Sequence, residues 1–338
     1  AEAASSREAL LAEHPDPGAG SLGVAAWARD QAARSVAGDL LITCVSGGGS
    51  SMMCGWGAEH HGRRRALIAN LRARGASIEE INAVRSVLDP LKRGGLRREF
   101  EPGDTLTLVL SDTPFAPASV VASGPTIPST QAPIDEILAR YDLPPHHDHS
   151  TRTGDEGADP LGSRDTAHLV VEVGGNDTMI TAVVEALRED IDDVHRGPCL
   201  RGDAFQAGQD FARILCEGEH EVLISGGECT TMIRGRGRGG RTMEFALGAA
   251  QHLRGRARLG VLVLSTDGQD GTSGAGGAVA HGGTLAQLQQ RGLSVADLLS
   301  RSDSATGLRA VAGLIESRAS DTNVADIALG WRLPDAPT

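Results

Sequence analysis

Two glycine-rich segments carry the residue types that bind anions. Ser46–Ser50 reads Ser-Gly-Gly-Gly-Ser after an apolar run, and Arg234–Arg241 reads Arg-Gly-Arg-Gly-Arg-Gly-Gly-Arg. Glycine has no Cβ to hold an anion away from the backbone N–H groups, and it tolerates a positive φ. The second segment adds four guanidinium groups, which suit phosphate and carboxylate better than lysine does. Phosphate chemistry is therefore the first hypothesis.

Each segment also has a plainer interpretation. A tight glycine turn after a strand can serve packing alone, and an arginine-glycine repeat can be an RNA-binding tail. Apolar segments flank the arginine-glycine run on both sides, which argues against a tail. The formal net charge of -12 would repel nucleic acid, so it disfavours a sequence-independent polyanion binder.

Length and composition favour two domains of the α/β class. A chain of 338 residues forms one large or two medium domains, and two is the better interpretation. Aromatic residues make up 3% of the chain, so the cores must consist of Ala, Val, Leu and Ile. The five cysteines form no C-x-x-C pair and follow no secretory segment, which predicts buried thiols in a reducing cytoplasm. No apolar run approaches the roughly 18 residues of a membrane helix, which predicts a soluble protein.

Short apolar runs alternate with longer helical patterns along the chain. Runs bounded by Gly, Ser or Asp predict strands at Asp39–Ser46, Thr105–Ser111, His168–Val173, Glu221–Ser225 and Leu259–Ser265. Helical patterns occur at Arg63–Arg74, Asp135–Tyr141, Asp177–Glu189, Asp203–Glu217 and Met243–Leu253. This alternation predicts largely parallel sheets that helices cover on both faces.

Polar clusters follow four of the predicted strands. They begin after Val45, Leu110, Ile224 and Leu264. In parallel sheets, ligands bind at the carboxyl ends of the strands, so we expect these clusters to form one site.

The segment Leu143–Arg164 interrupts the alternation, because it is polar and contains a Pro-Pro pair. It predicts a linker or a mobile surface loop. His146, His147 and His149 could ligate a metal, but a solvated histidine cluster is the preferred interpretation because nothing nearby would orient the rings. The expected domains are 1–142 and 168–338, with 143–167 between them.

A series of short motifs runs along nearly the whole chain. In order they are Ser46-Gly-Gly-Gly-Ser50, Ile81–Arg85 with Lys92 and Gly94-Gly95, Ser111-Asp112, Ala122–Thr126, Ser225–Glu228, Arg236–Arg241 with Glu244-Phe245, Thr266–Gly268 with Asp270-Gly271, and Thr322–Val324 with Asp326. Together they resemble the glycerate 2-kinase family of the MOFRL type, some of whose members carry the name hydroxypyruvate reductase. So many motifs in order are a specific signal, whereas one glycine run alone is weak.

The resemblance implies an ATP- and Mg²⁺-dependent transfer of the γ-phosphoryl group to the 2-hydroxyl of D-glycerate. It also implies two α/β domains with the active site in the interdomain cleft. Phosphoryl transfer needs anion-binding loops, guanidinium groups and metal-holding carboxylates, and the chain has all three. Neither a Walker A motif nor the protein-kinase signature set occurs. We expect a cytoplasmic kinase for D-glycerate or a related small hydroxy acid, with no nucleic-acid or membrane partner; a homodimer is left open.

Matching the family motifs assigns the site residues. The expected catalytic residues are Arg241, Lys92 and Asp267, and the expected Mg²⁺ ligands are Asp267, Asp270 and Glu228. The expected phosphate and substrate contacts are Ser46, Gly47, Gly48, Gly49, Ser50, Arg85, Asp112, Ser123, Asn176, Arg236, Arg238 and Asn323. Turn or helix capping is the alternative for the carboxylates and asparagines, and solvated surface charge is the alternative for the cations.

Several positions depart from the family pattern. The family's Gly-Ala-Gly-Lys turn, with its proposed catalytic lysine, does not occur in this sequence, and Lys92 is expected to replace that lysine. Pro114–Pro117 stands in place of Gly-Asp-Asp, and Gly274 in place of an aspartate, which predicts weak metal binding. Two alternatives stay open: a relative that binds nucleotide or hydroxy acid without turnover or works beside another subunit, and a lyase or NAD(P)-dependent reductase on the same scaffold.

Overall fold

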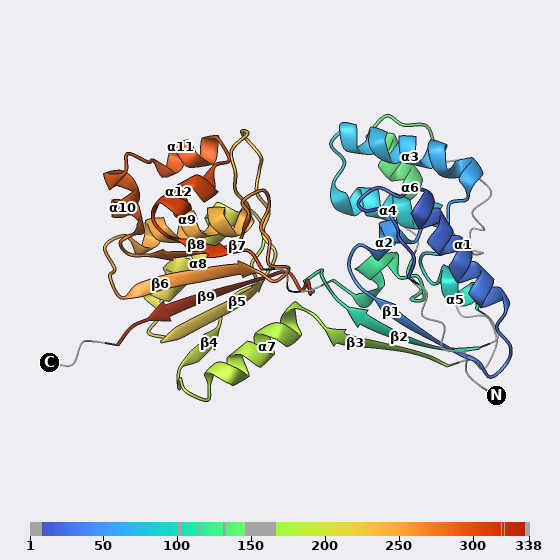
Figure 1. The fold of residues 1–338 in the computed structure, drawn as a ribbon, viewed down its shortest axis with the longest axis horizontal. Coiled ribbons are helices and arrows are strands. Elements are labelled where there is room, and N and C mark those ends of the chain that lie inside the picture. The colour runs from blue at the N-terminus through green and yellow to red at the C-terminus, as the bar shows by residue number, and fades with distance from the viewer. Residues whose placement is uncertain are drawn as a thin grey trace. The chain divides into compact units, whose positions relative to one another are not determined.

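The structure is a computed structural model that describes residues 9–100, 103–114, 116–130, 133–145, 167–318, 320 and 322–334. Contacts within the chain divide it into two compact units. Unit 1 contains the described residues up to Leu110 and from Ala116 to Val173, and unit 2 contains those from Ser111 to Pro114 and from Gly174 onward. Each unit has its own sheet and its own helices (Figure 1).

Unit 1 is built on a three-stranded parallel sheet in the order β1-β2-β3. Its strands are β1 (Leu40–Val45), β2 (Asp104–Leu110) and β3 (His168–Gly174). Its helices are α1 (Ala19–Ala33), α2 (Gly49–Met52), α3 (Ala58–Ala73), α4 (Ile78–Leu88), α5 (Gly95–Glu99), η1 (Ala118–Ser123) and α6 (Ile134–Arg140). Figure 1 shows these helices on one side of the sheet.

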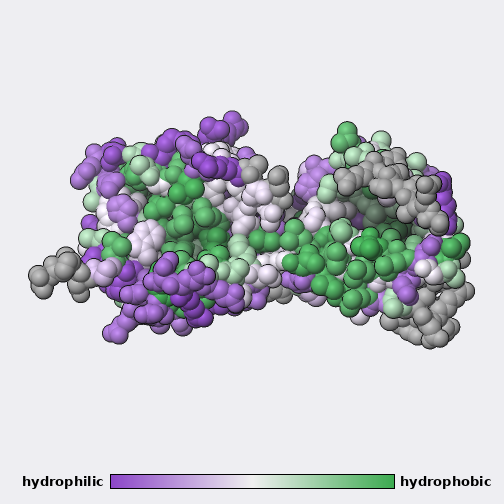
Figure 2. Space-filling view, turned by 60° about the horizontal axis from the view of Figure 1, so that its bottom comes forward, coloured by the Kyte–Doolittle hydropathy of each residue, from purple (hydrophilic) through white to green (hydrophobic). Residues whose placement is uncertain are grey.

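The other face of this sheet is apolar and exposed. It carries Leu40 and Ile42 of β1 and Leu169, Val171 and Val173 of β3, whose side chains are 37% to 59% exposed. Figure 2 shows the apolar surface that they form. The expectation that helices cover both faces is therefore wrong for this sheet within the described residues, because the described helices of unit 1 all pack on one side.

Unit 2 contains a six-stranded sheet in the order β4-β5-β9-β6-β7-β8. Its strands are β4 (Val194–Arg196), β5 (Val222–Gly227), β6 (Leu259–Ser265), β7 (Ala275–His281), β8 (Leu314–Glu316) and β9 (Asp326–Arg332). Of its described strand pairs, β4–β5 is parallel and the others are antiparallel. The predicted largely parallel sheet is wrong for this unit, because the last strand of the chain inserts antiparallel between β5 and β6.

Helices cover both faces of this second sheet. They are α7 (Asn176–Leu187), α8 (Ala204–Glu217), α9 (Arg241–Leu253), α10 (Thr284–Gln290), α11 (Val295–Ser300) and α12 (Ser304–Ala310). Helices α8 and α9 pack on one face around a large core that includes Phe211 and Phe245. Helix α7 packs on the other face, where Ile180 meets Val222 and Ile224. None of the described helices has an apolar stretch of the length that spanning a bilayer requires.

The strands and helices that the sequence predicts all occur, with ends that differ by a few residues. The prediction missed four strands and eight helices, which are β4, β7, β8, β9, α1, α2, α4, α5, η1, α10, α11 and α12. Strand β7 is rich in Gly and Ala and lacks the usual apolar signal. Cys54 and Cys229 are buried as expected, but Cys44 is exposed. The predicted linker falls largely on residues 146–166, outside the described residues, so the domain boundaries stay predictions.

Helices α8 and α9 cross closely at two glycines. A Cβ on Gly208 would lie 2.0 Å from the backbone oxygen of Phe245, and a Cβ on Gly248 would lie 2.0 Å from that of Phe205. A side chain at either position would collide with backbone, so the two helices approach this closely because both residues are glycine. Since α9 begins with Arg241, the crossing also positions that arginine.

We expect Gly208→Ala and Gly248→Ala each to lower the free energy of unfolding by about 1–3 kcal/mol, because the added methyl group pushes the helices apart. Gly23 in α1 is the matched control, since a Cβ there meets no atom within 4 Å. Gly23→Ala should raise the free energy of unfolding by about 0.5–1 kcal/mol through helix propensity. Urea unfolding followed by circular dichroism measures all three, and the same sign at all three positions would contradict the close crossing.

Candidate functional site

The predicted site residues fall into two groups, one in each unit. Unit 1 holds Ser46, Gly47, Gly48, Gly49, Ser50, Arg85, Lys92 and Ser123, and unit 2 holds Asp112, Asn176, Glu228, Arg236, Arg238, Arg241, Asp267, Asp270 and Asn323. Each group has contacts of its own.

In unit 2, two carboxylates hold Arg241 at the start of α9. Its Nε donates to Oδ2 of Asp326 at 2.6 Å, and its Nη2 donates to Oδ1 at 2.9 Å. Its Nη1 lies 3.0 Å from Oε1 of Glu228. Asp326 begins β9 and Glu228 follows β5, which is the neighbouring strand. These contacts use three of the five N–H donors of the guanidinium and leave two.

Burial and charge shift the pKa values of Arg241 and Asp326 in opposite directions. Burial alone would lower the pKa of Arg241, but the hydrogen bonds and charge of Asp326, together with Glu228, raise it above its usual range. Burial raises the pKa of Asp326 to about 6, although the guanidinium opposes the shift. Both groups are therefore charged at neutral pH, and Asp326 begins to take up a proton as the pH falls toward 6.

Asp112 and Asp267 bring further negative charge toward Glu228. Burial raises the pKa of Glu228, Arg241 lowers it, and the charges of Asp112 and Asp267 raise it again. Asp112 follows β2 and Asp267 follows β6, so three segments distant in sequence contribute to this acidic group. Carboxylates that repel one another are relieved when a cation lies among them.

The acidic group (Asp112, Glu228 and Asp267) leaves oxygen atoms for a ligand. In Asp267, Oδ1 accepts from Ser265 Oγ at 2.9 Å and from Gln269 N at 2.8 Å, and neither bond uses Oδ2. Within the described part of the chain, no three His, Cys, Asp or Glu side chains form a group that could hold a metal ion. The magnesium role of Asp267, Asp270 and Glu228 stays a prediction.

Asp270 caps helix α9. Its Oδ2 accepts from Thr242 N at 3.0 Å and from Thr242 Oγ1 at 2.6 Å, and Met243 N lies 3.4 Å away. The side chain is 1% exposed, and its burial raises the pKa of the carboxyl group. A carboxylate at a helix N-terminus satisfies N–H groups that have no partner within the helix. Asp270 therefore fixes the end of the helix that carries Arg241.

The arginine-glycine run lies along the turn between α11 and α12. A Cβ on Gly235 would lie 2.5 Å from the backbone oxygen of Arg301, and one on Gly239 would lie 2.2 Å from Ser304 Oγ. The N–H groups of Arg234, Gly235, Gly237, Arg238 and Gly239 donate to Ser302, Arg301, Asp303 and Thr272. Most backbone donors of the run are thus used within the protein. Its exposed guanidinium groups, Arg236 and Arg238 among them, are what it offers to an anion.

Two asparagines hold the loop that leads into β9. Asn176, the first residue of α7, is 5% exposed and donates through Nδ2 to the carbonyl groups of Val324 at 2.8 Å and Asp326 at 3.0 Å. Asn323 is exposed, and its Oδ1 accepts from Ala325 N at 3.1 Å. Both contacts fix the backbone beside Asp326, and a contact with substrate stays a prediction for both residues.

In unit 1, the serine-glycine loop (Ser46–Ser50) joins β1 to α2. Among the described residues, nothing accepts a hydrogen bond from the backbone N–H of Gly47, Gly48 or Ser50. The hydroxyl groups of Ser50 and Ser123 lie 2.9 Å apart, so the two predicted residues are in direct contact. This loop, unlike the arginine-glycine run, keeps the free backbone donors that an anion needs.

The backbone around this loop is strained. Ala122, Ser123 and Gly124 have φ values of 50°, 61° and 57°, and the adjacent Arg93 and Gly94 have values of 53° and 80°. The two segments are joined because Arg93 N donates to Ser123 O at 3.0 Å and Gly94 N donates to Gly124 O at 2.8 Å. Left-handed backbone at residues other than glycine costs energy and clusters at ligand sites. The strain supports a binding role for this part of unit 1.

Lys92 lies beneath the loop. Its side chain is 2% exposed, and Nζ donates to Met53 O at 2.8 Å and to Gly49 O at 3.4 Å. Burial lowers its pKa, and the charge of buried Asp89 opposes that shift. The ammonium group therefore holds the two ends of α2, and the catalytic role predicted for Lys92 stays a prediction.

The sequence reasoning missed the segment that lies over the loop. His14 reaches the loop, where a Cβ on Gly48 would lie 3.3 Å from its Cδ2 and 3.5 Å from its Nε2. Asp16 accepts from Arg85 Nη2 at 3.2 Å and from Arg72 Nη2 at 3.1 Å, so Arg85 is already paired. The two prolines of His14-Pro-Asp-Pro17 are the sequence signal by which this segment could have been found.

Comparison with known families covers most of the chain. Residues 1–153 match a domain of unknown function, DUF4147, and residues 221–326 match the MOFRL family. These matches confirm the family resemblance that the motifs predicted.

Named relatives match over most of their length. An Agrobacterium vitis protein with the provisional name hydroxypyruvate reductase is 32% identical, over 95% of this chain and 76% of its own. A glycerate kinase of Macaca fascicularis is 31% identical over 96% of each chain. The crystal structure of a glycerate kinase from Thermotoga maritima superimposes with a TM-score of 0.84 and 26% identity, over 95% of this chain and 80% of its own.

The contacts of Asp270 predict a stability effect that is separate from metal binding. We expect Asp270→Ala to lower the free energy of unfolding by about 1–3 kcal/mol, because it removes the cap and leaves buried N–H groups without a partner. Asp270→Asn should lose less, since its amide oxygen can still accept from Thr242. Urea unfolding in EDTA measures both, and an effect of Asp270→Ala that appears only with added Mg²⁺ would contradict the capping role.

Proposed function

Since the chain belongs to the glycerate kinase family, with DUF4147 and MOFRL regions, we propose that it transfers the γ-phosphoryl group of ATP to a hydroxyl of D-glycerate or a related small hydroxy acid. The observation that carries the proposal is the Arg241 network at the start of α9, beside the acidic group. Phosphoryl transfer requires mainly that the protein position the reacting groups and neutralise the negative charge of the phosphate oxygens, and we assign both tasks to these residues.

Arg241 is the proposed stabiliser of the transferring phosphoryl group. Asp326 fixes its guanidinium by two hydrogen bonds, and Asp270 fixes the helix from which it projects. A guanidinium that is held before the reaction starts needs no reorganisation as negative charge develops. Its two remaining N–H donors, with the exposed Arg236 and Arg238, would bind phosphate oxygens.

In this proposal the acidic group binds Mg²⁺ only together with the phosphate groups of ATP, because among the described residues no three Asp, Glu, His or Cys side chains could hold a metal ion by themselves. Asp112, Glu228 and Asp267 supply the carboxylate oxygens that a hard cation prefers, and their mutual repulsion fits a bound cation. When bound, the metal would neutralise charge on the phosphate oxygens. Asp270 is an indirect contributor in this proposal, because Thr242 already occupies one of its oxygens.

The serine-glycine loop is the proposed site of the hydroxy acid. The N–H groups of Gly47 and Gly48 have no acceptor in the described part of the chain, and together with the hydroxyl groups of Ser50 and Ser123 they suit a carboxylate. His14, whose ring lies against Gly48, is the proposed acceptor of the proton of the substrate hydroxyl. The prediction that both groups of residues act in one interdomain cleft belongs to this proposal.

A reductase is the second candidate, because the Agrobacterium vitis relative carries that name. The arginine-glycine run does not favour it. The glycines of that run pack against residues 301–304 and do not form a short turn between a strand and a helix, which is where a dinucleotide pyrophosphate binds.

Phosphoryl transfer tests the proposal directly. The purified protein is incubated with labelled ATP, Mg²⁺ and either D-glycerate or a panel of small hydroxy acids, and in parallel with NADH and hydroxypyruvate. We expect a labelled hydroxy acid and no oxidation of NADH. Without a labelled acceptor the kinase proposal fails, and oxidation of NADH would support the reductase.

Arg241→Lys keeps the positive charge but loses the planar fork that binds Asp326. We expect kcat to fall by about 10²–10³ with a smaller change in KM for ATP, because the interaction matters most in the transition state. Arg213→Ala is the control, since Arg213 is exposed on α8 and pairs only with residues of its own helix among the described contacts. An unchanged kcat in a folded Arg241→Lys protein would remove Arg241 from the mechanism.

Asp267→Asn should raise the Mg²⁺ concentration for half-maximal activity by about tenfold, because one charged oxygen ligand becomes a neutral one. Asp297→Asn, a change at an exposed residue of α11, serves as the control. Titration of Mg²⁺ at saturating ATP measures both variants. Identical Mg²⁺ curves for the wild type and Asp267→Asn would show that Asp267 is not a ligand.

A further inference from the structure

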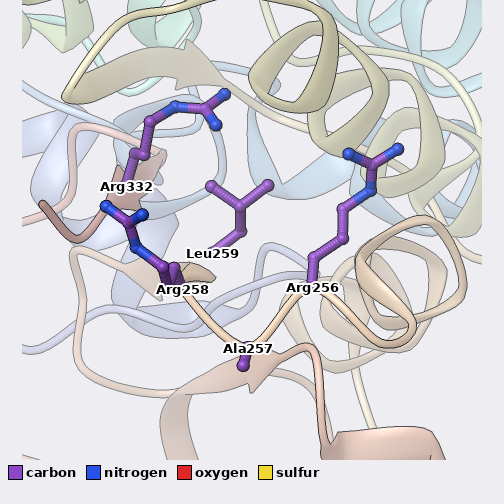
Figure 3. Close-up of a pocket in the computed structure, with 5 residues that line it drawn as sticks. All are labelled: Arg256, Ala257, Arg258, Leu259 and Arg332. Carbon is purple, nitrogen blue, oxygen red and sulfur yellow. The ribbon is translucent and has the colours of Figure 1, made fainter. Parts of the chain in front are cut away.

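A hollow of about 370 Å³ lies in unit 2 where β6 begins and β9 ends. Its lining consists of Arg256, Ala257, Arg258, Leu259 and Arg332. Figure 3 shows Leu259 between Arg256 on one side and Arg258 and Arg332 on the other. Leu259 is buried and gives the hollow an apolar floor below three guanidinium groups.

Two of these guanidinium groups are held in place by backbone carbonyl groups. Arg332 donates through Nη2 to Leu215 O at 2.7 Å and to Gly218 O at 2.6 Å, at the C-terminal end of α8. Arg258 donates through Nη2 to Leu333 O. The Nε of Arg332 is buried, and no described residue accepts a hydrogen bond from it. Arginines that are tethered in this way lose little conformational freedom when they bind a ligand.

Two of the arginines that line the hollow have no partner carboxylate among the described residues. The chain has a formal net charge of -12, yet among the described residues no carboxylate pairs with Arg256 or Arg332. The charges of both arginines also reach Cys216, where they oppose the rise in thiol pKa that burial causes. Arg256 and Arg332 therefore bring to this volume positive charge that has no partner carboxylate among the described residues, and Glu217 is the carboxylate that acts on the same thiol.

The hollow is separate from the candidate active site. Strands β6 and β9 pair antiparallel, with Leu259 opposite Arg332 at one end and Ser265 opposite Asp326 at the other. At a rise of about 3.3 Å per residue, the two ends lie about 20 Å apart. The ligand of this hollow is therefore not the phosphate group that Arg241 would contact.

We propose that this three-arginine hollow is a binding site for a small polyanion, either a phosphate or a polycarboxylate. Guanidinium groups bind the planar carboxylate and the phosphate group through paired N–H donors, and two or more negative charges are needed to engage more than one arginine. A volume of 370 Å³ accommodates a molecule of the size of citrate.

Isothermal titration calorimetry at low ionic strength tests the site with inorganic phosphate, citrate and, as a monoanion, acetate. We expect phosphate or citrate to bind at least about tenfold more tightly than acetate, and the tighter of the two identifies the source of the anion. Arg256→Ala should weaken that binding by about tenfold or more. Arg254→Ala is the matched control, because Arg254 is exposed two residues earlier and does not line the hollow.

Arg241→Lys separates this site from the proposed active site: the binding component that Arg256→Ala weakens should keep its affinity in Arg241→Lys, and a component that only Arg241→Lys removes belongs to the proposed active site. Arg332 is left unchanged, since its loss would also remove the contacts at the end of α8. Equal affinity in the wild type and Arg256→Ala, or binding that is lost in Arg241→Lys and kept in Arg256→Ala, would overturn the proposal. Neither outcome depends on whether the protein is a kinase.

Discussion

The paired hydrogen bonds between Arg241 and Asp326 are the interaction on which the second unit depends. They tie the start of α9 to the start of β9, the strand that inserts between β5 and β6. Asp326 is 3% exposed, and a buried carboxylate without its partner would cost several kcal/mol. Asp270 fixes the start of α9 by accepting from a helix N–H group. Asn176 fixes the start of β9 by donating to the carbonyl groups of Val324 and Asp326. The position of Arg241 is therefore fixed by its hydrogen bonds to Asp326 and by the capped start of α9.

Glycine has a different structural role in each of the two glycine-rich segments. In the arginine-glycine run, the missing Cβ lets the chain lie against residues 301–304, and the backbone donors are used there. In the serine-glycine loop, the donors of Gly47 and Gly48 stay free among the described residues, and the neighbouring backbone adopts left-handed conformations. One segment thus presents side-chain cations, and the other presents backbone N–H groups. Both are ways to bind an anion, but they suit ligands of different shape.

Local sequence patterns predicted the family, five of the nine described strands and five of the twelve described α-helices. Periodicity depends on neighbours along the chain, so runs such as Leu259–Ser265 and patterns such as Asp203–Glu217 predicted β6 and α8 nearly to the residue. Motif order predicted the family, and glycine with serine predicted an anion-binding loop, which stays a prediction; among the described residues nothing accepts from the N–H groups of Gly47 and Gly48. The chemistry of these residues is a property of their types, which is why the sequence alone indicated it.

The tertiary structure alone decided which residues meet. The direction of β9 depends on hydrogen bonds to strands about 60 to 100 residues away, so no local period predicts that the second sheet is mixed. Asp270 reads in the sequence as a metal ligand, yet its carboxylate reaches the N-terminus of α9, 28 residues earlier. His14 lies against Gly48 for the same reason, since contact between distant segments follows from packing and not from spacing. Residue types determine what chemistry is available, and long-range packing determines which groups carry it out together.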